Sequence, residues 1–459
     1  MLRSVTSRIP VPSLVPGGRS RAWGLLWLLA LAGCAHEPSA SVPPAQSADS
    51  GLTQAAEAPA PPASPETSAP LSTEARFAQW LSGFRLAAER AGIREATLSS
   101  ALDTAQLQSR IIRNDRNQGE YVRPVWAYLD SAVSPLRVRI GRARLADTAP
   151  SAPAAQAAQA RHGVPASVLV AIWGIETSFG SHLGDVRVID ALATLAFDGR
   201  REAWARQELM AALRIIDQGD IDAEHMIGSW AGAMGQTQFM PSTFLAHAVD
   251  ADGDGRRDLW GSLDDVMGST ANYLQHSGWV AGEPCLTEVR LPSGFDPALA
   301  ESDIRRDASA WAQAGVRPVD DTAPTAALPA MHDASILLPA GLQGPAFMVG
   351  RNFRAVLHYN RANSYALAVC LLAQQIDGGP GVQATWPRDQ RLLTRSEVMT
   401  LQSQLNALGF DAGEADGVAG PATRKALRAW QRQQGLPADG FVNAEVLGRL
   451  TASNEAPAP

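Results

Sequence analysis

The chain has 459 residues and a formal net charge of -7 at pH 7. This length exceeds what one ordinary hydrophobic core accommodates, so we expect one large domain and at least one smaller one. The acidic balance, together with the lack of any Lys- or Arg-rich run, excludes a general electrostatic attraction to nucleic acid or to anionic membrane surfaces.

The N-terminal segment has the pattern of a secretory signal peptide over residues 1–33. Several arginines precede an apolar stretch, residues 22–32, which is too short to span a membrane as a stable helix. The stretch ends in LAGC at 31–34, which resembles a bacterial lipobox and implies lipidation of Cys34. Because Ala35 follows rather than aspartate, the resemblance also implies an outer-membrane lipoprotein facing the periplasm. The alternative is an ordinary signal peptide with a chance cysteine.

Composition and periodicity predict a mainly α (α+β) protein with several parts. Apolar residues recur at helical spacing over most of the large domain, whereas residues 285–291 alternate like a short strand and 292–344 suggest a small α+β insertion. The predicted parts are a disordered tether (34–74), the large domain (75–376), a Gly/Pro linker (377–391), a small helical domain (392–451) and a disordered tail (452–459). The predicted helices of the large domain include 121–145, 164–179, 200–218, 242–247, 263–276 and 353–375.

Glu176 lies near the end of the predicted helix over 164–179. Ile172, Trp173 and Phe179 are three or four residues away, so neighbouring turns place apolar groups around the carboxyl. Such surroundings raise a carboxyl pKa toward the range that a general acid needs. The alternative is a solvated glutamate at a helix boundary.

Residues 228–241, GSWAGAMGQTQFMP, combine glycines with glutamine and methionine in a pattern that does not suit a core helix. Glycines let a backbone approach a ligand closely. Ser229, Gln236 and Gln238 offer neutral hydrogen-bonding groups of the kind that bind sugar hydroxyls and acetamides. Trp230 and Phe239 could stack on sugar rings or simply pack.

The loop that begins at Asp250 starts like an EF-hand. Oxygen-bearing side chains stand at its first, third, fifth and ninth positions, and glycine stands at the sixth. The twelfth position is Gly261, where the standard loop has a bidentate glutamate. The pattern therefore leaves two interpretations, a structural divalent-cation site or an Asx-turn loop without an ion. The candidate ligands in the first part of the loop are Asp250, Asp252, Asp254 and Asp258.

Cys285 and Cys370 are the cysteines beyond the lipobox. They could form a disulfide in an oxidising periplasm or remain two buried thiols, and neither has the CxxC spacing of a redox or zinc site.

Several motifs in the large domain, in the same order, resemble the membrane-bound lytic murein transglycosylase B family. They are DRNQ at 115–118, IWGIETSFG at 172–180, RVIDALATLAFD at 187–198, AGAMGQTQFMP at 231–241 and HYNRANSYA at 358–366. The resemblance covers residues 77–376 and implies a lysozyme-like helical catalytic domain. Long motifs in a fixed order are much more specific than a single short pattern.

This resemblance implies that Glu176 is the catalytic residue and that the second and last motifs line the substrate site. It also implies a longer EF-hand-like loop, closed by Asp264 or Asp265, that holds structural Ca²⁺, whereas the chemistry itself requires no cofactor. The implied substrate-binding residues are Ser229, Met234, Gln238, Phe239, Tyr273, Tyr359, Asn360 and Tyr365.

The implied reaction cleaves the bond between N-acetylmuramic acid and N-acetylglucosamine in peptidoglycan without consuming water, as a carbon–oxygen lyase. Ordinary glycosidases use two carboxylates, but neither motif that matches around the site carries a second acid beside Glu176. One group would therefore act first as acid and then as base, with the muramyl C6 hydroxyl as the internal nucleophile.

Residues 392–451 resemble the three-helix peptidoglycan-binding domain of cell-wall hydrolases. An Asp-Gly pair occurs twice there, at 416–417 and 439–440, each time before a helix-like stretch. Such a domain would raise the effective concentration of glycan strands at the catalytic domain. Alternatives are a lysozyme-like muramidase and a non-catalytic peptidoglycan-binding lipoprotein, and the pattern leaves partners among cell-wall synthesis or remodelling proteins open.

Overall fold

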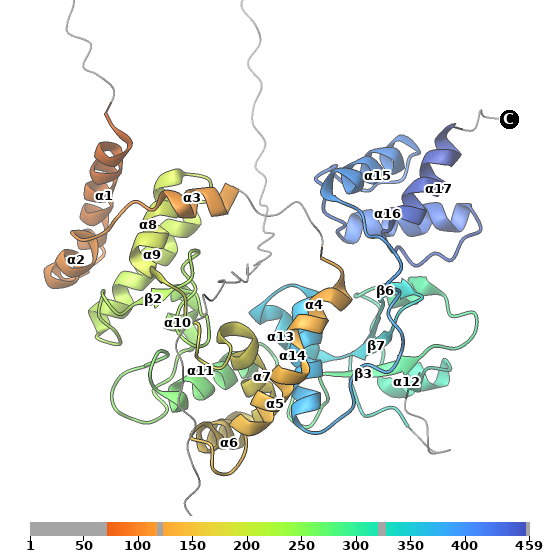
Figure 1. The fold of residues 1–459 in the computed structure, drawn as a ribbon, viewed down its shortest axis with the longest axis horizontal. Coiled ribbons are helices and arrows are strands. Elements are labelled where there is room, and N and C mark those ends of the chain that lie inside the picture. Colours follow the sequence, from red (N-terminus) through yellow and green to blue (C-terminus); the bar gives the residue numbers. More distant parts are fainter. Residues whose placement is uncertain (1–70, 117–122, 320–326, 456–459) are drawn as a thin grey trace, which may run out of the picture.

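The computed structural model describes residues 71–116, 123–319 and 327–455 (Figure 1). The predicted signal peptide, Cys34 and residues 34–70 of the predicted tether lie outside the described residues. The first helix begins at Thr73, before the predicted end of the tether, because the Ser72 hydroxyl caps it by accepting a hydrogen bond from the Ala75 N–H at 3.1 Å. The first three helices are α1 (Thr73–Arg90), α2 (Glu95–Leu102) and α3 (Ser109–Arg116).

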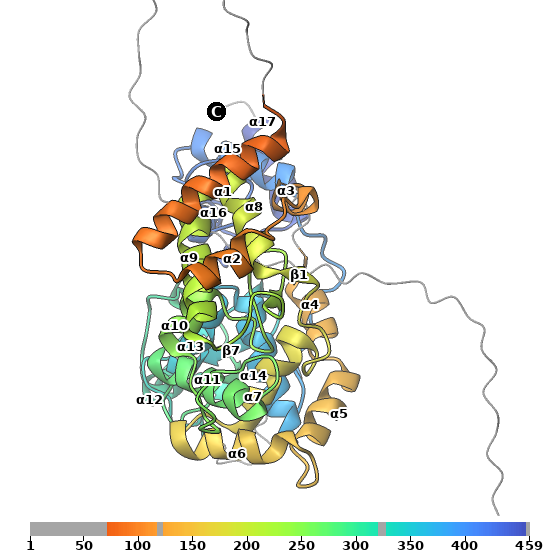
Figure 2. The ribbon, with the colours of Figure 1, turned by 90° about the vertical axis from the view of Figure 1, so that its left-hand side faces the viewer.

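The large domain is built around α7 (Ala166–Thr177), which packs against α14 (Asn363–Ile376) and also contacts α6 (Ser151–His162). Every residue of α7 except Glu176 is buried. Figure 2 shows α6 running beneath α7 and α11. The remaining helices of this domain are α4 (Val125–Ala132), α5 (Pro135–Arg144), α8 (Val188–Asp198), α9 (Glu202–Gln218), α10 (Pro241–His247), α11 (Leu263–His276) and α13 (Arg351–Tyr359).

An antiparallel sheet has the strand order β4-β3-β7-β5. Its strands β4 and β5 lie within the predicted α+β insertion over 292–344, whereas β3 and β7 flank those bounds. The predicted strand over 285–291 is β3 (Leu286–Arg290), which pairs with β7 so that Leu286 lies opposite Val349. Cys285 and Cys370 form a disulfide, with Cα atoms 5.8 Å apart, that joins the start of β3 to α14. The other elements here are η1 (Pro297–Ala300), α12 (Ala308–Gln313), β4 (Arg317–Pro318), β5 (Ser335–Leu337), β6 (Pro339–Leu342) and β7 (Ala346–Val349). A separate two-stranded sheet pairs β1 (Val186–Arg187) with β2 (Ile227–Gly228).

The C-terminal domain has three helices, as predicted: α15 (Arg395–Ala407), α16 (Pro421–Gln433) and α17 (Ala444–Glu455). They share a core that includes Leu401, Leu427, Trp430 and Leu450. In Figure 1 these helices form a separate group beside β6. Of the helices in the described part of the chain, none has both the length and the apolar character needed to cross a membrane.

Three boundaries predicted from the sequence are wrong. The predicted helix over 121–145 is two helices, since Pro135 takes the first position of α5 and cannot continue α4. The predicted helix over 353–375 also breaks, between α13 and α14, where the Asn360 side chain accepts a hydrogen bond from the Ala362 N–H at 3.1 Å. Residues 452–455, predicted to be disordered, extend α17.

Candidate active site

Glu176 stands in the last turn of α7, just before the chain reverses. Ser178 and Phe179 both have positive φ, 50° and 60°, which is uncommon for residues other than glycine. The Phe179 N–H donates to the Trp173 carbonyl at 3.2 Å, so the chain folds back along the helix. Such left-handed residues cost energy and cluster at functional sites.

Gly174 makes this reversal sterically possible. A Cβ at Gly174 would lie 2.6 Å from the Phe179 ring, so any larger residue would displace that ring. The Phe179 ring instead packs edge-on against Trp173, with ring centroids 5.6 Å apart. The glycine and the two aromatic residues of the IWGIETSFG motif therefore fix the position from which Glu176 projects.

The Glu176 carboxyl accepts a hydrogen bond from the Tyr365 hydroxyl at 2.6 Å. Burial raises the pKa of Glu176 to about 7, although the hydrogen bond from Tyr365 acts in the opposite direction. Among the described residues, no second carboxylate contributes to the raised pKa of Glu176. A carboxyl with this pKa is present in both protonated and ionised forms near neutral pH, so it can donate and accept a proton.

Tyrosines from three elements surround Glu176. Tyr365 from α14 stacks on Tyr359 at the end of α13, with centroids 6.3 Å apart. Burial and the Glu176 charge raise the pKa of both tyrosines well above the usual value. The same two causes raise the pKa of Tyr128, in α4, to about 12. Tyr128 is a site residue that the sequence analysis missed, because no local pattern shows that α4 lies near Glu176.

Gln236 joins the 228–241 loop to α7. Its side chain accepts from Trp173 Nε1 at 2.7 Å and donates to the Trp260 carbonyl at 2.9 Å. The Gln236 carbonyl accepts from the Thr177 hydroxyl at 3.0 Å. Gly180, with φ +80°, lets the loop come this close, since a Cβ there would lie 2.4 Å from Gln236 Oε1.

Ser229 and Gln238, the polar side chains of this loop that were predicted to bind substrate, form hydrogen bonds within the protein. The Ser229 hydroxyl accepts from the Ala233 N–H at 3.1 Å. Gln238, with φ 52°, donates through Nε2 to the Leu183 and Gly235 carbonyls, at 3.1 and 3.0 Å. Both side chains are only partly buried, so each retains polar surface for a ligand.

Met234 and Phe239 lie behind the loop. Met234 is fully buried, and Phe239 packs on Tyr273 and Tyr359 with centroids 5.5 and 5.7 Å apart. Both side chains are buried in the packing of the loop, and their role in substrate binding stays a prediction. Tyr273, from α11, donates to the His358 carbonyl at 2.8 Å, and Asn360 caps the turn before α14.

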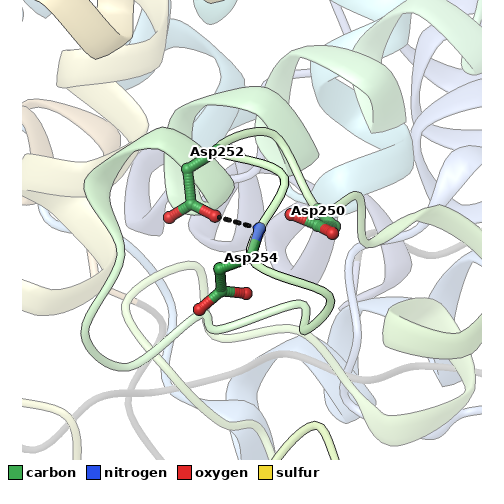
Figure 3. A group of neighbouring side chains, drawn as sticks. All are labelled: Asp250, Asp252 and Asp254. Carbon is green, nitrogen blue, oxygen red and sulfur yellow. Dashed lines mark hydrogen bonds between the residues drawn. The ribbon is translucent and has the colours of Figure 1, made fainter.

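The predicted cation loop brings together three of its five candidate ligands. Asp250, Asp252 and Asp254 are exposed, and one ligand oxygen of each lies within 4.8 Å of the others (Figure 3). This donor set suits a hard cation such as Ca²⁺. Asp258 instead accepts from the N–H groups of Trp260 and Gly261, both at 2.8 Å, and exposed Asp264 stands outside the group.

Asp265 closes the loop without joining the exposed group. It is buried and accepts from the Ala251 and Asp258 N–H groups, both at 2.6 Å, so it joins the two ends of the loop. Asp265 therefore links the two ends of the loop through hydrogen bonds to backbone, and which of the two aspartates would complete a cation site stays a prediction.

Residues 76–374 match the family described as the transglycosylase SLT domain, and residues 394–450 match a peptidoglycan binding domain. The membrane-bound lytic murein transglycosylase B of Escherichia coli is 36% identical over 222 residues, which are 47% of this chain and 58% of that protein. The chain thus spans less than two thirds of the length of this relative.

Two solved structures also resemble this chain. SltB3 from Pseudomonas aeruginosa, in complex with NAG-NAM-pentapeptide, has 50% identity and a TM-score of 0.78, covering 82% of this chain and 99% of that one. The Escherichia coli lytic transglycosylase Slt35, in complex with calcium, has 30% identity and a TM-score of 0.54, covering 66% of this chain and 93% of that one.

Proposed function

Because the chain belongs to the transglycosylase SLT domain family, we propose that it is a lytic transglycosylase that cleaves peptidoglycan glycan strands. The observation that carries this proposal is Glu176, a partly buried carboxyl with a pKa of about 7 among three tyrosines. The relatives named for murein transglycosylase activity and for a bound muropeptide support the same substrate class.

Glu176 acts twice in the proposed mechanism. Its protonated carboxyl donates a proton to the glycosidic oxygen as the bond from that oxygen to muramyl C1 breaks. The resulting carboxylate accepts the proton of the muramyl C6 hydroxyl, whose oxygen bonds to C1 and forms the 1,6-anhydro ring. The internal nucleophile replaces a bound water and a second carboxylate. This agrees with the causes of the raised Glu176 pKa, to which no second carboxylate of the described residues contributes.

Substitution of the acid tests this mechanism. We expect Glu176→Gln to reduce lysis of purified sacculi by a factor on the order of 10² or more, because the amide can neither donate nor accept the transferred proton. Exposed Glu224→Gln, the matched control, should retain activity. Mass spectrometry of wild-type products should find anhydromuramyl ends.

The same product analysis separates the alternatives. Reducing muramyl ends would indicate a lysozyme-like muramidase. Sacculus binding without any cleavage would indicate a non-catalytic wall-binding protein. Near-normal lysis by Glu176→Gln would remove the assigned role of that residue.

For localisation we propose a lipid anchor at Cys34 on the periplasmic face of the outer membrane. The lipobox at 31–34 supports it, and the related Escherichia coli protein is named as membrane-bound. Cys34→Ser should release the protein into the soluble periplasmic fraction, because a chain without acyl groups has no membrane affinity of this kind. Fractionation of cells that express each form would check this, and persistent membrane association of the variant would contradict it.

We also propose that Asp250, Asp252 and Asp254 hold a structural Ca²⁺. Their convergence supports it, as does the calcium complex of the related Slt35. A cation that binds only the folded state at about 100 times its dissociation constant adds about 2.7 kcal/mol of stability. Calcium should therefore raise the melting temperature of the wild type but not of Asp252→Asn. An equal increase in both proteins would contradict the assignment.

A further inference from the structure

The C-terminal domain contains the same hydrogen-bonded loop twice. In the first clamp (Gln402, Asp416, Gly417 and Val418), Gln402 Nε2 donates to Asp416 Oδ1 at 3.0 Å, and Gln402 Oε1 accepts from the Gly417 N–H at 2.9 Å. Asp416 Oδ1 also accepts from the Val418 N–H at 2.8 Å. The helix residue and the Asp-Gly turn thereby hold each other in place.

The second clamp (Gln431, Asp439, Gly440 and Phe441) repeats each of these bonds. Gln431 Nε2 donates to Asp439 Oδ1 at 3.2 Å, and Gln431 Oε1 accepts from the Gly440 N–H at 2.8 Å. Asp439 Oδ1 accepts from the Phe441 N–H at 3.0 Å. The two clamps are therefore equivalent in their internal geometry, and each leaves the second carboxylate oxygen for another donor.

In the second clamp that oxygen binds an extended segment of the catalytic domain. Asp439 Oδ2 accepts from the Leu342 N–H of β6 at 3.1 Å. Gly341, with φ +65°, lies so close that a Cβ there would stand 2.4 Å from Asp439 Oδ2 and 2.9 Å from Phe441 Cβ. Phe441 also packs against the core of the large domain. The second clamp thus shows which ligand this geometry accepts, namely an extended peptide with an unhindered left-handed residue before the donor N–H.

The first clamp offers the same features to solvent. Asp416 is exposed, and among the described residues no donor is bonded to its Oδ2. Val418, which corresponds to Phe441, is 53% exposed. Met399, three residues before Gln402, is 42% exposed, whereas Arg428, three residues before Gln431, is buried in an ion pair with Glu301. The acceptor Asp439 and the side chains of Phe441 and Arg428 contact the large domain, whereas their counterparts in the first clamp, Asp416, Val418 and Met399, are exposed.

We propose that the first clamp binds the peptide stem of peptidoglycan, through a backbone N–H that follows a small D-residue. This inference rests on the proposed function for the nature of the substrate. A left-handed φ strains L-residues but suits glycine and D-residues. A D-residue carries its Cβ on the other side of Cα and so avoids the two contacts that exclude an L side chain at Gly341. Peptidoglycan stems contain D-alanine, which meets both requirements.

The test uses the full chain with labelled Val and Met methyl groups and a synthetic stem pentapeptide ending in D-Ala-D-Ala. We expect the peptide to shift the methyl resonances of Val418 and Met399. Asp416→Asn keeps the Oδ1 acceptor but replaces Oδ2 by a donor, so it should weaken peptide binding about tenfold. The all-L peptide should lose affinity to a similar extent. Glu414→Gln, an exposed substitution in the same loop, is the matched control and should bind like the wild type.

Other outcomes would overturn the inference. If Asp416→Asn and Val418→Ser both bind the stem peptide as tightly as the wild type does, the first clamp is not its binding site. Concentration-dependent shifts of the Val418 methyls without peptide would assign the clamp to a second copy of the chain. Cleavage of peptide-free glycan oligomers is measured in parallel and should be unchanged in Asp416→Asn. Failure of the wild type to cleave them would instead contradict the proposed function and leave the binding result intact.

Discussion

At the residue scale, the raised pKa of Glu176 has a consequence for stability. Its folded-state pKa of about 7 exceeds the ordinary value of 4.5, so the folded protein binds this proton more tightly than the unfolded chain does. The contribution of protonated Glu176 to the free energy of unfolding is fully present below pH 4.5, and it is lost as the pH rises through 7.

Glu176→Gln removes this titration. The variant should therefore be more stable than the wild type at pH 8, by about 3 kcal/mol, and nearly equal to it at pH 4. Chemical denaturation at both pH values measures the difference. A stability difference that does not vary with pH would contradict the burial of the carboxyl, and Glu224→Gln provides the baseline.

Tyr365 is predicted to set the pH range of the reaction. Its hydroxyl lowers the pKa of Glu176 against the larger effect of burial, so Tyr365→Phe should raise that pKa further. The decline of kcat on the alkaline side should then move to higher pH, with a loss of about tenfold at the optimum from the missing hydrogen bond. Tyr273→Phe, whose hydroxyl contacts the His358 carbonyl instead, should leave the midpoint of the decline in place. A general loss of activity without a shift would indicate a purely structural role.

At the scale of elements, the contact between α7 and the 228–241 loop depends on Gln236. Gln236→Met would leave Trp173 Nε1 buried without an acceptor, which costs about 1–3 kcal/mol. It would also free the loop, so we expect a lower melting temperature and a raised KM. Gln238→Met, whose side chain bonds only to the Leu183 and Gly235 carbonyls, is the comparison. Equal effects of both substitutions on melting would contradict this account.

The sequence predicted those elements whose signal is local. The predicted helix over 263–276 is confirmed as α11, and the apolar run that ends near Glu176 is confirmed as α7. The helix breaks at Pro135 and Asn360 were missed because apolar periodicity continues across them. Tyr128 was missed for another reason, since only the tertiary packing brings α4 close to Glu176.

The cation loop shows the same limit. The spacing of the aspartates predicted which carboxylates could meet at one point, and three of them, Asp250, Asp252 and Asp254, do lie together. It could not distinguish a carboxylate that faces outward from one that bonds to backbone, as Asp258 and Asp265 do. Hydrogen bonds within a folded loop decide that, and periodicity does not report them.

At the scale of the whole molecule, the disulfide joins the insertion to the catalytic core. Cys285 and Cys370 are 85 residues apart in the sequence, so the bond restricts a long loop of the unfolded chain. Replacing both by serine should destabilise the protein by roughly 2–5 kcal/mol. Thermal melting with and without reductant measures this, and reductant should not affect the double variant. Equal melting of the oxidised wild type and the double variant would contradict the prediction.

An ion pair and a carboxylate are among the contacts that hold the C-terminal domain against the large domain, beside the packing of Phe441. Arg428 is buried against Glu301 at 2.5 Å, and Asp439 binds the Leu342 N–H. Without the charge of Glu301, Arg428 is buried with no counter-charge when the C-terminal domain is docked. When the domain separates from the large domain, water solvates Arg428, so the undocked state is favoured. Glu301→Gln should therefore shift the molecule toward an undocked state, with a larger radius of gyration in solution scattering.

Exchange of the Leu342 amide provides a second, local measurement. Undocking removes its acceptor, so deuterium exchange at this position should accelerate together with the increase in radius. Glu445→Gln breaks an exposed ion pair with Arg449 within α17 and should change neither quantity, since such pairs contribute little. If the radius and the exchange rate of Glu301→Gln both match the wild type, the ion pair is not needed for docking and the other contacts, the second clamp among them, hold the domain. In that case Asp439→Asn, which disturbs the acceptor itself, should be the substitution that releases it.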